Sequence, residues 1–487
     1  MTMQQLSAQD AQFLYAQSAN TLTHVMGIYV YDPSTAPGGT VRFKDIIGQI
    51  EHRIDSSPVF KRRLHRLPFD IDYPYWVEDE HFDVEAHVTH ARLPEPGDWR
   101  QFCIVAARHF SRPMDMTRPL WDVYVVEGLD RIPGVAPGSY ALLHRMHHAA
   151  IDGVSGTLAF IALSDKDASG TPALELNSQH GELGRTPATA DVIMRAVNSN
   201  LSSPVKLLNV AMKFMPALLG AAMKSSQPAA GENRAGVPQT RFNAAISPHK
   251  VFNAVSFALG DIVKLRALVE GATVNDVVLA ICSGALRTYL ARHRELPKSS
   301  LVAIAPVNAR SRSDTETTPG NKISAMTVRL ATTIENPVKR LQAIREFTRD
   351  AKEAKSGLSA RLMTDLTKHI PGATMAGVAR LLTSERFAPL QTNLFITNVP
   401  GPQFPLYMNG AMLTHQFGMG PITNNMGLFI AALSYNGRIS FSVTCDRVIM
   451  PDSDFFADCI RSAFDELRQA LPESQPRQRK VRKQKHS

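Results

Sequence analysis

The stretch that most constrains the fold covers residues 140–156, Tyr-Ala-Leu-Leu-His-Arg-Met-His-His-Ala-Ala-Ile-Asp-Gly-Val-Ser-Gly. An apolar, strand-like run comes first, and residues 154–163 have the composition of a buried helix. Between them stand His147, His148, Asp152 and Gly153, which we call the histidine motif. Side chains at a strand-to-helix turn often face a cleft, so this stretch predicts a functional site.

The histidine motif combines residues suited to proton transfer. Histidine titrates near neutral pH, so it can accept a proton and return it. A carboxylate such as Asp152 can fix the tautomer of a histidine or hold the loop in an ion pair, and Gly153 permits backbone conformations that a Cβ forbids. A lone histidine is more often a buried core residue, but two histidines before Asp-Gly favour catalysis.

Two other chemistries fit the motif poorly. The Gly-x-Ser-x-Gly pattern of a nucleophile elbow is absent from this turn, and Ser155 is expected to cap the following helix. The zinc-binding pattern His-Glu-x-x-His is also missing, and neighbouring histidines on a strand point to opposite faces. We therefore expect neither a serine nucleophile nor a metal here.

The pattern His-His-x-x-x-Asp-Gly resembles the signature of the acyl-CoA-dependent acyltransferase superfamily. Further segments make the chain similar to the bacterial wax ester synthase/diacylglycerol acyltransferase family, in that family's order and over nearly the whole chain. The family more often has Ser where Thr397 stands, a mild departure. The segments are Leu6-Ser-Ala-Gln-Asp-Ala-Gln-Phe13, Pro119-Leu120-Trp121, Asn275-Asp276, Gly320-Asn321 and Thr397-Asn-Val-Pro-Gly-Pro402.

The resemblance implies an α/β fold of two chloramphenicol-acetyltransferase-like halves with mixed sheets and an active site at their interface. It implies acyl transfer from acyl-CoA to a diacylglycerol or a long-chain alcohol, with no other cofactor and no acyl-enzyme. His148 would be the general base, and His147 would support the site or bind substrate. Asp152 would hold the loop, and Arg310 is a candidate ion-pair partner for it.

The resemblance also assigns residues outside the two histidines. Gly153, Asn275 and Asp276 would lie by the substrate, and Asn275 is a candidate hydrogen-bond donor to the oxyanion. Asp276 near a helix N-terminus has an ordinary explanation in the helix dipole as well. Support for the architecture of the site is expected from Pro119, Leu120, Trp121, Gly320 and Asn321, with Trp121 as a core aromatic.

Length and composition set the broader frame. A chain of 487 residues is too long for one ordinary core, and 44% hydrophobic with 20% charged residues is typical of a folded protein. Four scattered cysteines without CxxC spacing indicate neither a disulfide framework nor a cysteine metal site and fit a reducing cytoplasm. We expect no signal peptide and no transmembrane helix.

Two basic segments suggest where the protein works. Residues 477–485 form a basic tail, suited either to solubility or to anionic lipid headgroups, whereas nucleic acid is disfavoured because no aromatics are interleaved. Residues 190–224 are apolar and basic, typical of a helix lying on a membrane or lipid droplet, or of a packed crossover between halves. We expect a cytoplasmic protein with peripheral contact to the inner membrane or lipid inclusions.

Periodicity and composition divide the chain. The N-terminal acyltransferase half spans 1–185, an amphipathic crossover and linker 186–240, the C-terminal half 241–472 and the tail 473–487. Expected helices are 7–16, 43–54, 98–109, 154–163, 261–269, 273–290 and 452–471; expected strands are 24–31, 84–88, 121–127, 251–258, 301–307, 323–330, 393–397, 428–435 and 438–444.

Two alternative functions stay open at this point. One is an acyltransferase of the same superfamily with another acceptor, such as a polyketide or an amine. The other is a non-catalytic lipid-droplet protein, which would need the amphipathic segment and the tail but not an intact histidine motif.

Overall fold

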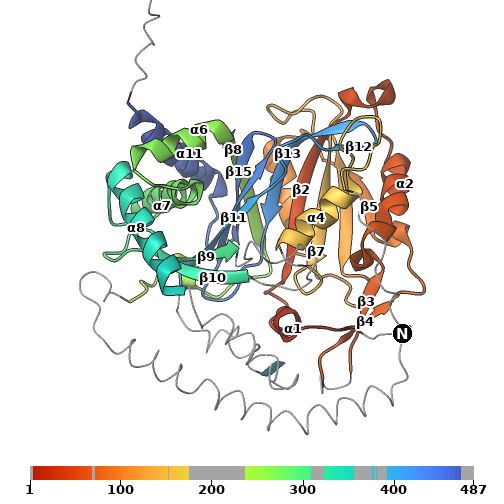
Figure 1. The fold of residues 1–487 in the computed structure, drawn as a ribbon, viewed down its shortest axis with the longest axis horizontal. Coiled ribbons are helices and arrows are strands. Elements are labelled where there is room, and N and C mark those ends of the chain that lie inside the picture. Colours follow the sequence, from red (N-terminus) through yellow and green to blue (C-terminus); the bar gives the residue numbers. More distant parts are fainter. Residues whose placement is uncertain are drawn as a thin grey trace, which may run out of the picture.

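The computed structural model describes residues 4–67, 72–151, 153–174, 236–308, 323–355, 376–377, 380 and 392–472. The described chain forms two α/β halves, each built on a six-stranded mixed sheet (Figure 1). Two halves with mixed sheets were expected, and this fold class is confirmed. The segment 190–224 and the basic tail lie outside the described residues.

The N-terminal sheet carries the histidine motif on one of its central strands. Strand β7 (Tyr140–His147) is buried throughout and pairs antiparallel with β2 (His24–Asp32) and β6 (Trp121–Glu127). The full order is β12 (Tyr407–Met408), β13 (Ala411–Met419), β2, β7, β6 and β5 (Val88–Arg92). A smaller sheet of β1 (Gln4–Gln5), β4 (Tyr75–Glu78) and β3 (Arg62–His65) accompanies it.

Strand β13 comes from late in the chain and pairs antiparallel with β2 of the N-terminal sheet. It also contacts the C-terminal sheet, where Ser442 Oγ accepts a hydrogen bond from Gly418 N at 3.1 Å. The hydroxyl of Tyr435 likewise donates to Leu413 O at 3.0 Å. This strand, which the sequence did not predict, therefore ties the two sheets together.

Alternation along β7 distributes its side chains between two apolar clusters. Leu142 packs into the cluster shared with α2 (Phe43–Arg53) and α4 (Gly153–Leu163). Leu143 points the other way, into a cluster with Phe102 of α3 (Trp99–Phe110). That second cluster also holds Phe252 from β8 of the other half, so α3 is wedged between the two sheets.

The C-terminal sheet has the order β10 (Ile323–Arg329), β9 (Val302–Asn308), β11 (Leu394–Pro400), β14 (Leu428–Tyr435), β15 (Arg438–Asp446) and β8 (Lys250–Ala258). Figure 1 shows helices on the outer side of this sheet, and those that the structure describes there are α6 (Leu259–Leu265), α7 (Val274–Arg292), α8 (Pro337–Lys355) and α11 (Ser453–Gln469). Among the described helices, α7 alone is long and apolar enough to cross a membrane. Its 18-residue window is 72% buried, as in the core helix of a folded domain.

Local signals placed most of these elements within a residue or two. The Asn436-Gly437 turn joins β14 and β15 with positive φ at both residues, as a tight hairpin requires. The expected strand at 84–88 is wrong. The Asp83 carboxylate accepts a hydrogen bond from Glu85 N at 2.9 Å and starts a 3₁₀ turn, Val84–Ala86, so the strand begins only at Val88. The four cysteines are free and buried.

Candidate active site

The turn after β7 is fixed by backbone bonds to both neighbouring segments. His147 N donates to Leu120 O at 3.0 Å, on the β6 side. His148 N donates to Thr23 O at 3.0 Å, on the β2 side. Ala150 N then closes the turn by donating to His147 O at 2.9 Å. The two histidines are therefore held at a defined place, where a central strand ends and α4 starts.

The side chain of His147 is completely buried and bound on both sides of its ring. Nδ1 accepts a hydrogen bond from Ala149 N at 3.1 Å. Nε2 lies 2.8 Å from Gln17 Oε1 and 3.0 Å from Thr23 Oγ1. Since Nδ1 is an acceptor, the proton of the neutral ring sits on Nε2 and is donated to Gln17.

Burial also keeps His147 neutral. Desolvation, reinforced by the neighbouring His24 and His148, lowers the pKa of His147 from 6.5 to about 3. A ring that is buried, neutral and bound through both nitrogens is not placed to take a proton from a substrate. Of the two roles expected for His147, the geometry favours support of the site.

The ring of His148 has a different setting. It lies on the turn itself, is only partly buried, and stacks on the ring of Phe13 with centroids 4.1 Å apart and planes 9° apart. A parallel stack keeps the plane of the imidazole aligned with the ring of Phe13. Of the two histidines, His148 is therefore the one whose imidazole is placed to meet a substrate.

Helix α1 (Ala8–Tyr15) supplies Phe13. The helix begins where the sequence predicts, because the Ser7 side chain caps it by accepting from Asp10 N at 3.0 Å. Thr23 Oγ1 donates to Phe13 O at 2.8 Å and ties the helix end to the motif. Sequence reasoning placed Phe13 in a family segment but gave it no role, and Gln17 and Thr23 carried no local signal.

The Pro119-Leu120-Trp121 segment supports the motif from the other side. Leu120 and Trp121 are each 1% exposed, in line with the expected core aromatic. Trp121 Nε1 donates to Phe60 O at 2.9 Å, and Trp121 O accepts from His87 Nδ1 at 2.7 Å. Since Leu120 O accepts the hydrogen bond from His147 N, this segment holds the start of the turn from the β6 side.

A buried charge cluster that the sequence did not reveal lies under β7, two residues before His147. The Arg145 guanidinium donates to Asp122 through Nε at 3.0 Å and Nη2 at 2.6 Å. It also donates to the carbonyls of His109 and Arg112 at 2.8 and 2.7 Å. The group fastens α3 to the motif strand.

Asn275 and Asp276 stand at the start of α7 in the C-terminal half. Asn275 Oδ1 accepts from Asn398 Nδ2 of β11 at 3.4 Å. Asp276 is 2% exposed, and Oδ2 closes a capping box with Thr273 N at 2.8 Å. Its Oδ1 accepts from Thr348 Oγ1 of α8 at 2.6 Å. The geometry thus supports the helix-start explanation for Asp276 over substrate binding.

Comparison with known proteins identifies the chain. The model of the wax ester synthase/diacylglycerol acyltransferase catalytic domain matches residues 6–278, and that of the family's C-terminal domain matches residues 319–468. The chain belongs to this family. It is an acyltransferase of the kind that the histidine motif and the ordered segments indicated.

Relatives and solved structures agree with this assignment. A Mycobacterium tuberculosis protein named as a candidate diacylglycerol O-acyltransferase is 30% identical, covering 95% of this chain and 98% of that protein. The wax ester synthase/diacylglycerol acyltransferase from Marinobacter aquaeolei VT8 is 26% identical, covers 96% and 99% of the two chains, and has a TM-score of 0.67. The starter condensation domain of rhizomide synthetase shares the fold, with 12% identity, coverage of 98% and 96%, and a TM-score of 0.56.

Three residues that the family resemblance singled out, Asp152, Gly320 and Asn321, lie outside the described residues, as does Arg310, the candidate ion-pair partner of Asp152. Gly153 is the first residue of α4. The expectation that Ser155 caps this helix is wrong, because α4 begins two residues earlier. Within α4, a Cβ at Gly156 would lie 2.7 Å from Ile151 Cδ1, so a small residue lets the helix pack on its own turn.

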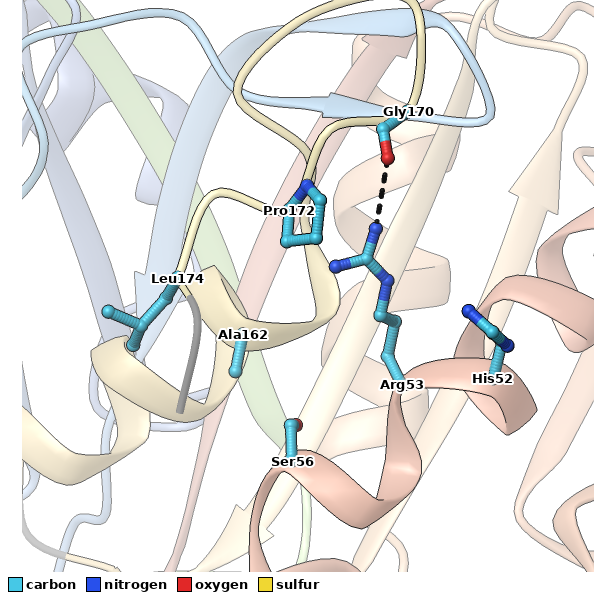
Figure 2. Close-up of a pocket in the computed structure, with 7 residues that line it drawn as sticks. All are labelled: His52, Arg53, Ser56, Ala162, Gly170, Pro172 and Leu174. Atoms are coloured by element: carbon cyan, nitrogen blue, oxygen red, sulfur yellow. Dashed lines mark hydrogen bonds between the residues drawn. The ribbon is translucent and has the colours of Figure 1, made fainter. Parts of the chain in front are cut away.

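A surface pocket of about 380 Å³ lies between α2 and α4, away from the family's motif (Figure 2). Its Ala162 is nine residues beyond the start of α4, roughly 14 Å along the helix from the histidine turn. Arg53 in its wall is already bound to Asp165 at 2.6 Å and to Gly170 O at 3.1 Å. We therefore do not assign this pocket to the acyl transfer.

Proposed function

We propose that the protein transfers a fatty acyl group from acyl-CoA to the hydroxyl of a diacylglycerol, of a long-chain alcohol, or of both. Family membership and the names of the relatives support this choice of substrates. The products are a triacylglycerol or a wax ester. Acyl-CoA is a co-substrate, and the proposed chemistry needs no resident cofactor.

The observation that carries the mechanism is the unequal setting of the two histidines. His147 is buried and bound through both ring nitrogens, whereas His148 sits on the turn, partly exposed and stacked on Phe13. His148 is accordingly the general base, and His147 is the support beneath it. This assignment of roles to the two histidines rests on their hydrogen bonds and burial, not on which of them comes first in the motif.

The proposed reaction moves one proton twice. His148 takes the proton of the acceptor hydroxyl while its oxygen attacks the thioester carbonyl of acyl-CoA. The tetrahedral intermediate collapses as the carbon–sulfur bond breaks, and the imidazolium returns the proton to the thiolate of CoA. No acyl-enzyme forms, because the acceptor hydroxyl attacks the thioester directly. Bringing both substrates together at one base supplies much of the acceleration.

The oxyanion of that intermediate needs a fixed hydrogen-bond donor. Asn275 is our candidate. Its Oδ1 faces Asn398, which leaves the amide Nδ2 as the group to donate. Asp152 is assigned to holding the loop, and Gly153 to letting α4 start close to the substrate.

Thiol release from palmitoyl-CoA tests the proposal, with hexadecanol or a diacylglycerol as acceptor. Release that needs an acceptor and falls by at least about 100-fold in His148→Ala is expected, in the range typical of general-base loss. His52→Ala is the matched control, since His52 lies on the exposed end of α2. Acceptor-dependent release that persists in His148→Ala would remove His148 as the base.

We further propose that the protein works at a lipid surface, because its acceptors are water-insoluble. The support is in the sequence, where residues 477–485 carry six Lys or Arg and no acid. Each cation near an anionic surface contributes about 1 kcal/mol. The location would be cytoplasmic, with peripheral contact to the inner membrane or to lipid inclusions.

A further inference from the structure

The connection between α1 and β2, residues 16–23, touches the histidine motif at three points. Gln17 Oε1 lies 2.8 Å from His147 Nε2. Thr23 Oγ1 lies 3.0 Å from the same nitrogen, and Thr23 O accepts the backbone N–H of His148. Both histidines are thus held by one short segment.

The C-terminal half holds the same connection from its other side. Asn20 Nδ2 donates to Ile246 O at 3.0 Å. Lys250 Nζ, on a side chain 1% exposed, donates to Asn20 O at 3.0 Å and lies 4.0 Å from the buried Asp446 carboxylate. Hydrogen bonds to both halves of the protein therefore hold this connection in place.

Within this connection, the Gln17 carboxamide oxygen accepts the hydrogen bond that the buried His147 ring donates from Nε2. Ala149 N–H needs an acceptor at Nδ1, so the proton must stay on Nε2, where Gln17 Oε1 receives it. Without that acceptor the Nε2–H would be buried with Thr23 Oγ1 as its remaining partner. A change of tautomer that moved the proton to Nδ1 would set that N–H against the N–H of Ala149. Ala149 directly follows His148 in the turn.

We propose that Gln17 is a positioning residue for acyl transfer, acting through His147 to hold the turn that carries His148. The inference rests on the proposed function of His148. Displacing a catalytic group by about 1 Å costs roughly 100-fold in rate. Loss of the Gln17 acceptor should accordingly lower kcat by 10- to 100-fold while KM for acyl-CoA changes less than threefold.

Two substitutions at Gln17 keep a side chain of similar length and differ in whether it can accept a hydrogen bond. Gln17→Met removes the acceptor oxygen, and Gln17→Glu keeps one. Gln12→Met is the control, because Gln12 lies on the exposed face of α1, the helix just before this connection. We expect Gln17→Met to lose kcat, Gln17→Glu to stay within about threefold of wild type, and Gln12→Met to match wild type.

The inference is overturned if Gln17→Met keeps the wild-type kcat, if both Gln17 variants lose kcat equally, or if only KM changes. A wild-type protein that releases no thiol with any acceptor would instead defeat the proposed function. If Gln17→Met does not fold, ¹⁵N chemical shifts of histidine-labelled wild type decide the matter. The His147 signal, assigned by its loss in His147→Asn, must show Nε2 protonated and Nδ1 bare, and the reverse refutes the inference.

Discussion

Asp122 offers the sharpest test of how the motif strand is stabilised. Burial raises the pKa of its carboxyl, but hydrogen bonds from His109 and Arg145 outweigh this effect and hold the pKa well below its usual range. The partner guanidinium of Arg145 is 5% exposed. Asp122→Asn would leave that charge buried with two carbonyl acceptors and a neutral amide. Removing one partner of a buried pair costs about 3–5 kcal/mol, and the remaining acceptors favour the lower end.

A surface pair of the same length is the control. Arg461 and Asp458 also lie 2.6 Å apart, but their side chains are 52% and 67% exposed. Asp458→Asn should cost no more than about 1 kcal/mol. Urea unfolding at pH 7.5 measures both free energies, and the double variant Asp122→Asn/Arg145→Met should regain much of the loss because no charge is then buried. Equal costs for the two single variants would refute the reasoning.

Four further outcomes follow. Phe13→Leu should lower kcat several-fold in steady-state assays, since a stacked pair contributes about 0.5–1.5 kcal/mol. Asp276→Ala should lower the free energy of unfolding by about 1–2 kcal/mol, as loss of a helix cap does. Burial lowers the pKa of His144 from 6.5 to about 4, so the unfolded chain takes up its proton first and stability falls as pH drops from about 6.5 towards 4. In urea titrations, His144→Leu should reduce the loss of stability between pH 7 and pH 5 by about 2 kcal/mol. Deleting residues 473–487 should weaken sedimentation with anionic vesicles but not with neutral ones.

What the sequence predicted were features encoded by neighbouring residues. Ser7 three residues before Asp10 encodes the start of α1, and the Asn436-Gly437 pair encodes a tight turn. The strand, turn and helix at the histidine motif follow from an apolar run, a break and a second apolar run. The same local logic failed at residues 84–86, where apolar composition indicated a strand and the Asp83 cap started a 3₁₀ turn.

The candidate site shows the same contrast between features encoded by neighbouring residues and features that depend on distant contacts. The identities of His147 and His148 were available from the motif, but their different surroundings come from contacts with Gln17, Thr23 and Phe13, more than 120 residues earlier in the chain. No spacing rule links a glutamine after a helix to a histidine on a distant strand. Asp276 shows the converse, because its helix-start explanation was visible locally and the structure supports it.

The pairing of β13 with β2 explains why the two halves act as one unit. Strand β2 begins at His24, directly opposite His147 in β7, and its other edge is filled by β13 from the C-terminal half. Without β13, the edge of β2 near the histidine turn would expose unpaired N–H and C=O groups. The Asn20–Lys250 contact fixes the adjoining connection from the same side. The position of His148 therefore depends on both halves at once, as expected for a site at their interface, and neither half should hold the turn in place alone.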